Sequence, residues 1–146
     1  MEKVFNWRQE KNKDNFKFIA IYFEDKLFGK LPNLDLDSYS VINSKYFQLE
    51  TVRKLFSEKN YIVDPKTKSR LYEIVRYSDA SYHLEKDSKS FYLLTKSWYY
   101  NNDPKISFGF DKVFSRKSGK VAVSSDTDIE LLVFSAFCVE KLNVPD

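Results

Sequence analysis

Residue types that perform catalysis are scarce in this chain. Its 146 residues include one His, His83, and one Cys, Cys138. Nucleophilic and acid–base catalysis need a nucleophile and a base within hydrogen-bond reach, and a zinc site built from His and Cys needs three or four ligands. We therefore expect no catalytic residue, no metal and no cofactor. His83 is predicted to be an exposed strand residue between Tyr82 and Leu84, and Cys138 to be a buried thiol with a raised pKa and low reactivity.

Three carboxylates, Asp126, Asp128 and Glu130, precede an apolar stretch. They could hold a hard cation, but they lack the spacing of a calcium-binding loop. Thr127 and Glu130 have the spacing of a capping box, in which the Thr127 hydroxyl accepts from the Glu130 amide and the Glu130 carboxylate accepts from the Thr127 amide. Carboxylates also stabilise the positive end of a helix dipole. The pattern therefore predicts the start of a helix rather than a cation site.

Aromatic and cationic residues occur together in one part of the sequence. The Trp-Tyr-Tyr run at 98–100 is followed by four basic residues, Lys112, Arg116, Lys117 and Lys120. Such a mixture suits a membrane interface or a surface that stacks single-stranded bases. In the plainer interpretation the aromatic residues belong to the core and the basic residues keep the surface hydrated. We take the four basic residues as candidate lipid-binding residues, clustered near an expected turn at 117–120.

The composition indicates one globular domain over residues 1–146. The chain has 13 Phe, 10 Tyr and 2 Trp but only three Gly and four Pro, which argues against disorder and against Gly-rich phosphate loops. The first residues lack the apolar run of a signal peptide, and the longest apolar stretch, residues 129–139, is too short to span a membrane. One Cys cannot form an intramolecular disulfide. We therefore expect a cytoplasmic protein with no transmembrane segment.

Short apolar segments alternate with polar clusters along residues 1–125. Residues 16–23, 61–63, 70–77, 90–95 and 105–110 have the composition of strands. Clusters of turn-forming residues lie at 11–15, 35–38, 57–60, 64–68, 85–88, 101–104 and 117–120. The spacing predicts roughly ten to twelve antiparallel strands, because no helical segment is available for parallel crossovers.

The last segment differs from the others. Residues 128–142 are expected to form a helix whose apolar side chains surround nearly its whole circumference. A single sheet face could not cover such a helix, so it should be enclosed by the strands. The alternative is a strand, since residues 132–134 and 137–139 are compatible with β structure.

Three segments of the chain resemble a known family. Residues 125–139 resemble the acidic-then-apolar closing helix of the tubby C-terminal-like superfamily, which includes phospholipid scramblases, plant LURP-one-related proteins and small bacterial members. Residues 22–31 and 61–71 resemble hairpins of that superfamily. The resemblance implies a closed barrel of about twelve strands around a central hydrophobic helix. The residues that match are packing residues, so the resemblance transfers no catalytic or binding position. The scramblase activities are not carried over either, because the chain lacks the cysteine cluster and the Asp-rich calcium loop of the scramblases.

The sequence therefore predicts an all-β domain with one C-terminal helix, arranged as a closed antiparallel barrel around that helix. We expect a non-enzymatic interaction module that recognises anionic lipid headgroups or a protein partner. Two alternatives stay open: a barrel that binds a small apolar ligand, and a surface that binds single-stranded nucleic acid, which ranks lowest. The oligomeric state is not predicted.

Overall fold

The computed structural model describes residues 3–32, 36–78, 81–95, 106–107 and 118–142. These ranges contain eleven strands and one helix. The elements are β1 (Lys3–Lys11), β2 (Lys17–Phe23), β3 (Lys26–Leu31), β4 (Ser40–Ile42), β5 (Lys45–Lys54), β6 (Ser57–Val63), β7 (Arg70–Ser78), β8 (Ser81–Lys86), β9 (Lys89–Thr95), β10 (Ile106–Ser107), β11 (Ser118–Val123) and α1 (Ile129–Leu142).

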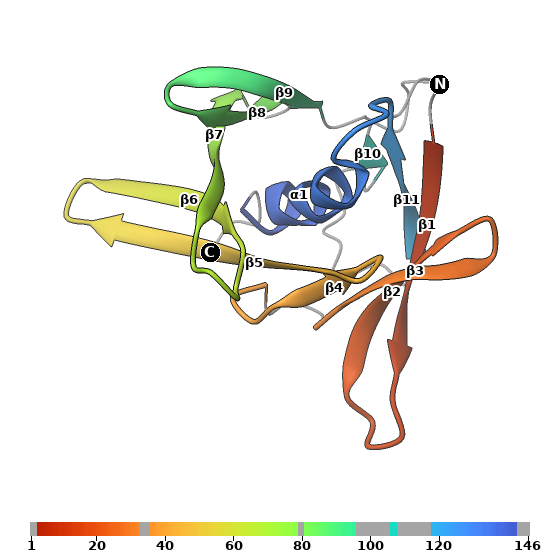
Figure 1. Cartoon of the computed structure of the whole chain (residues 1–146). Helices are drawn as coiled ribbons and strands as arrows, with labels where there is room; N and C mark the ends of the chain where they lie inside the picture. Colours follow the sequence, from red (N-terminus) through yellow and green to blue (C-terminus); the bar gives the residue numbers. More distant parts are fainter. Residues whose placement is uncertain (1–2, 33–35, 79–80, 96–105, 108–117, 143–146) are drawn as a thin grey trace.

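The strands form one antiparallel sheet in the order β10-β11-β1-β2-β3-β4-β5-β6-β7-β8-β9. Strands β1 to β8 each pair with the next strand along the chain, so the predicted antiparallel meander is confirmed. Strand β5 joins the two halves of the sheet, because its first three residues pair with β4 while Gln48–Lys54 pair with β6. The sheet can therefore bend at β5 and surround α1 from several sides (Figure 1).

Four hairpins have two-residue turns that lie within the described residues. In three of them both turn residues are polar and have positive φ, at Glu24–Asp25, Asn43–Ser44 and Asp87–Ser88. Positive φ at both positions is the geometry that matches the twist of the flanking strands. The fourth turn, between β5 and β6, consists of Leu55 and Phe56. The turn predicted at 57–60 is therefore wrong, because Ser57–Val63 is strand β6.

The predicted C-terminal helix is confirmed as α1. Every residue from Leu131 to Glu140 is buried, as expected for a helix that is apolar on all sides. Phe134 stacks on Phe47 of β5 with ring centroids 5.6 Å apart, and Phe137 meets Trp7 of β1 edge-on at 5.9 Å. Because β2, β3 and β4 separate β1 from β5 in the sheet, the helix brings strands that are not neighbours into one core.

The predicted closed barrel is wrong. The described strands form an open sheet that ends at β10 and β9, and these two strands are not paired with each other. Strand β10 contributes only two register pairs to β11. A cavity of about 440 Å³ lies between β9 and β11 over the helix, lined in part by Leu94, Val121 and Leu132. Enclosure of the helix in the described residues thus comes from curvature of an open sheet and not from closure of the hydrogen-bond ladder.

Glycine is required at one strand position by close packing. A Cβ built on Gly119 of β11 would lie 2.6 Å from Nε1 of Trp7. Gly119 is opposite Trp7 in the register of β1 and β11, and the Trp7 side chain is buried. The indole therefore occupies the space that any other residue at 119 would need.

Candidate functional site

One of the four basic residues predicted to bind lipid, Lys120, lies among the described residues. Lys112, Arg116 and Lys117 lie outside the described residues, as do Trp98, Tyr99 and Tyr100. Lys120 is exposed in strand β11, opposite Asn6 of β1. Its place in a strand corrects the prediction of a turn over 117–120, since β11 begins at Ser118.

Lys120 lies on the outer face of β1, β2 and β11, where a guanidinium group also lies over a tyrosine ring. Arg8 lies diagonally next to Lys120 across the β1–β11 ladder, and its guanidinium is 4.4 Å from the ring centroid of Tyr22. The Tyr22 hydroxyl donates to Glu10 at 2.6 Å. Hydrogen bonding to Tyr22 and attraction by Glu10 raise the pKa of Arg8. This face therefore mixes aromatic and basic groups, but its charges and rings are engaged with one another.

Cys138 has the buried environment predicted from the sequence, whereas His83 lies in the predicted strand but is half-buried rather than exposed. His83 is on β8 with Tyr82 and Leu84 buried on the opposite face. Its Nδ1 is 2.7 Å from the Ser90 hydroxyl. Cys138 is fully buried in α1, and burial raises the pKa of its thiol well above the ordinary value. These positions indicate packing and surface roles for the two residues.

The start of α1 differs in detail from the predicted capping box. The first helical hydrogen bond runs from the Leu132 amide to the Asp128 carbonyl, 2.9 Å, so Asp128 rather than Thr127 precedes the helix. The Glu130 carboxylate forms an ion pair with Lys45 at 3.2 Å instead of returning to the Thr127 amide. Among the described residues, no group of three His, Cys, Asp or Glu side chains could hold a metal ion.

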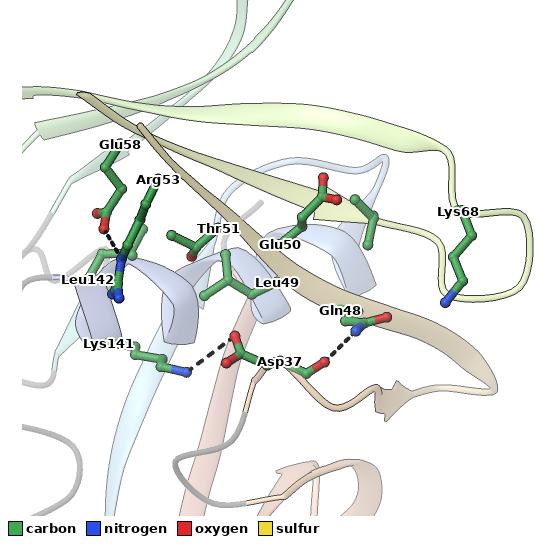
Figure 2. A pocket seen from close by; sticks show the side chains of 11 residues that line it. Asp37, Gln48, Leu49, Glu50, Thr51, Arg53, Glu58, Lys68, Lys141 and Leu142 are labelled. Atoms are coloured by element: carbon green, nitrogen blue, oxygen red, sulfur yellow. Dashed lines mark hydrogen bonds and ion pairs between the residues drawn. The ribbon is translucent and has the colours of Figure 1, made fainter. Parts of the chain in front are cut away.

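A cavity of about 620 Å³ lies at the C-terminal end of α1, against the inner face of β5 (Figure 2). Leu49, Val63 and Leu142 form apolar parts of its wall. Its charged lining consists of three carboxylates and three cations: Asp37, Glu50, Glu58, Arg53, Lys68 and Lys141. Because six charged side chains line it, we take this cavity as the first candidate for a functional site.

The carboxylates of this cavity are all engaged in ion pairs. Asp37 pairs with Lys141 at 3.7 Å and Glu58 with Arg53 at 2.9 Å, as Figure 2 shows. Glu50 accepts from Arg70 at 2.7 Å. The Thr51 hydroxyl donates to Asn60 at 2.7 Å. Charges that neutralise one another leave little field to attract a charged substrate, and a hydroxyl that donates to an amide oxygen has no base to activate it.

The β5–β6 hairpin extends past this cavity and away from the helix (Figure 1). We call residues 53–59 the arm, because all seven are exposed. Arg53 and Glu58 face each other on the side of the cavity. Lys54 and Lys59 occupy diagonal positions on the opposite side. Leu55 and Phe56 form the turn at the end.

The arm carries a positive charge on a surface rich in apolar area. Arg53, Lys54 and Lys59 oppose the single carboxylate of Glu58, which gives the arm a formal charge of +2. Leu55 and Phe56 are 87% and 93% exposed. Sequence reasoning missed this arrangement, because the polar residues after Phe56 were interpreted as the turn. The available signal was a Leu-Phe pair set between Arg-Lys and Ser-Glu-Lys.

In the described part of the chain, no helix has the length and apolar character to cross a membrane. Comparisons with models of protein families, with curated proteins and with solved structures find no match. The resemblance to the tubby C-terminal-like superfamily therefore stays a prediction.

Proposed function

We propose that this protein is a non-enzymatic module that binds membranes containing anionic lipid, and that the arm makes the contact. One observation carries the proposal: seven consecutive exposed residues project from the sheet and combine three cations with two apolar side chains. Amphipathic segments of this composition seat at the boundary between headgroups and acyl chains. The partner that fits is an anionic lipid surface.

The electrostatic part of the interaction depends mainly on Lys54 and Lys59. Both lie on the side of the hairpin away from Glu58, whereas Arg53 pairs with Glu58. A basic residue near an anionic leaflet contributes about 1 kcal/mol. The two lysines together then contribute about 2 kcal/mol, equivalent to about thirtyfold in affinity. Binding of this kind is weak, reversible and sensitive to salt.

The alternatives receive less support from the arrangement of the residues. An apolar ligand at the centre of the sheet would compete with α1, whose residues 131–140 are buried there, which leaves the cavity between β9 and β11 as the place for such a ligand. Stacking of single-stranded bases needs accessible rings beside cations. On the outer face of β1–β3, Arg8 lies over the ring of Tyr22 and Lys30 lies over the ring of Phe18. A base could stack on either ring only after displacing the side chain that lies over it.

Co-sedimentation with vesicles tests the proposal. We expect the protein to pellet with vesicles of phosphatidylcholine and phosphatidylserine in equal amounts and to stay in solution with phosphatidylcholine alone. Binding should weaken as salt shortens the Debye length from about 10 Å at 0.1 M to about 3 Å at 1 M. Equal pelleting with the two kinds of vesicle would contradict the proposal.

Charge reversal separates the arm from other basic surfaces. The double variant Lys54→Glu/Lys59→Glu should lose at least about thirtyfold in affinity. The matched control Lys26→Glu/Lys89→Glu has the same net charge, changes exposed lysines on other hairpins, and should retain most of the binding. Replacing Lys112, Arg116, Lys117 and Lys120 by Glu tests the site predicted from the sequence. Loss of binding only in this last variant would move the contact away from the arm.

A further inference from the structure

We infer that Leu55 and Phe56 enter the membrane interface and anchor the protein there, with Lys54 and Lys59 at the level of the headgroups. This inference rests on the proposed function and adds the depth and the point of insertion. It predicts a contact in which apolar burial, and not charge alone, determines the affinity.

The exposure of this pair sets it apart from the other apolar residues. Leu55 is 87% and Phe56 93% exposed, whereas Phe16 follows at 69% among the described large hydrophobic residues. The pair also stands at the end of a projecting hairpin, where no other part of the described chain can cover it (Figure 1). Removing such side chains from water is favourable in proportion to the apolar area buried.

The backbone geometry of the β5–β6 turn does not require Leu and Phe. The three other two-residue turns within the described residues use polar residues at positive φ, in keeping with the preference of such turns for Asn, Asp and Gly. Neither Leu55 nor Phe56 has a positive φ. Polar residues would serve this turn equally well and would avoid exposing apolar surface, so the choice of residues points to a contact outside the fold.

The hairpin presents the pair in a fixed geometry. The ladder between β5 and β6 continues to Lys54 and Ser57, directly before and after the turn. Its root is held by the Thr51–Asn60 hydrogen bond of 2.7 Å, with the Asn60 side chain buried. A tip that is already ordered loses little conformational freedom on binding.

The positions of the lysines fit insertion to a shallow depth. A strand rises about 3.3 Å per residue, so Lys54 and Lys59 lie within about 10 Å behind the tip. Interfacial segments bury their apolar groups about 5–10 Å into the boundary between headgroups and acyl chains. Insertion of the tip would therefore bring both ammonium groups to the phosphates. An apolar groove on a protein would have no need of cations at this distance, so we assign the tip to an anionic membrane.

Site-specific labelling tests the insertion. An environment-sensitive fluorophore attached to Phe56→Cys should become brighter and shift to the blue with phosphatidylserine-containing vesicles. The native thiol does not interfere, because Cys138 is fully buried. The same label on Lys86→Cys, at the exposed end of β8, serves as the control and should not change. Leu55→Ser/Phe56→Ser should bind about a hundredfold more weakly, with an unchanged melting temperature because both side chains are exposed.

The possible outcomes separate this inference from the proposed function. If wild-type protein pellets with the vesicles but the label at position 56 does not respond, or the double Ser variant binds normally, insertion is refuted and electrostatic binding stands. If wild-type protein does not bind the vesicles, the proposed function is refuted and the inference with it. A response at both label positions would also refute insertion at the tip.

Discussion

The helix α1 lies at the centre of the core, and the variant Phe134→Ala tests how much this helix contributes to stability. Phe134 has no exposed surface and stacks on Phe47 with ring centroids 5.6 Å apart and an interplanar angle of 20°. Replacing it by Ala removes the ring from the middle of the helix and leaves a cavity facing β5. The helix itself should still form, because Ala has the highest helix propensity.

The expected cost is large relative to the stability of one domain. Truncation of a buried Phe to Ala costs about 3–5 kcal/mol, from the lost burial and the cavity left behind. A domain of this kind has a free energy of unfolding of about 5–15 kcal/mol. We therefore expect a clear fall in the urea midpoint and a melting temperature lower by roughly 10 °C.

Urea unfolding followed by circular dichroism measures this effect. The matched control is Phe16→Ala, which truncates the same residue type at a position that is mostly exposed. We expect the control to change the free energy of unfolding by less than about 0.5 kcal/mol. A loss below about 1 kcal/mol for Phe134→Ala, or equal losses in the two variants, would mean that α1 is not the centre of the core.

Three further predictions follow from individual contacts. Gly119→Ala should destabilise the protein by about 1–3 kcal/mol, because a Cβ would meet the buried indole of Trp7; a neutral result in urea unfolding would contradict this packing. Cys138 should not react with a thiol reagent in the native protein but should react in denaturant, because the side chain is fully buried and burial raises the pKa of its thiol; rapid labelling of the native protein would contradict enclosure of α1. The Tyr92 hydroxyl donates to Asp128 at 2.6 Å, and this hydrogen bond raises the pKa of Tyr92. Its stabilising contribution is therefore present below the ordinary pKa of about 10 and is lost as the pH rises through the raised value. The difference in urea midpoint between wild type and Tyr92→Phe should shrink at high pH, and a difference that grows would be inconsistent with this contact.

The strands and the helix could be predicted because their signals are local. Alternation of apolar and polar residues identifies a half-buried strand, and an apolar circumference identifies a helix that must be enclosed. The buried run from Leu131 to Glu140 follows from the second rule alone. Closure of the sheet follows from neither rule, because it depends on whether the first and last strands meet. In the described residues β9 and β10 do not pair, and no local pattern encodes that outcome.

The candidate site was missed for a different reason. Turn prediction looks for Asn, Asp, Gly, Pro and Ser, and the nearest such cluster to the β5–β6 turn is Ser57–Asn60. The actual turn residues, Leu55 and Phe56, look like strand residues by composition. Their exposure can be known only once the register of β5 and β6 is known. An apolar pair between Arg-Lys and Ser-Glu-Lys, at the junction of two strands, is the pattern that could have revealed the arm.

We propose that the arm is the part of the protein that contacts anionic membranes. Hydrogen exchange of the backbone amides, compared between the free protein and the protein on phosphatidylserine-containing vesicles, tests this most directly. We predict slower exchange on vesicles for the amides of residues 53–59, and unchanged exchange at the β2–β3 turn of Glu24 and Asp25. Protection that spares residues 53–59 and appears elsewhere on the surface would contradict the claim.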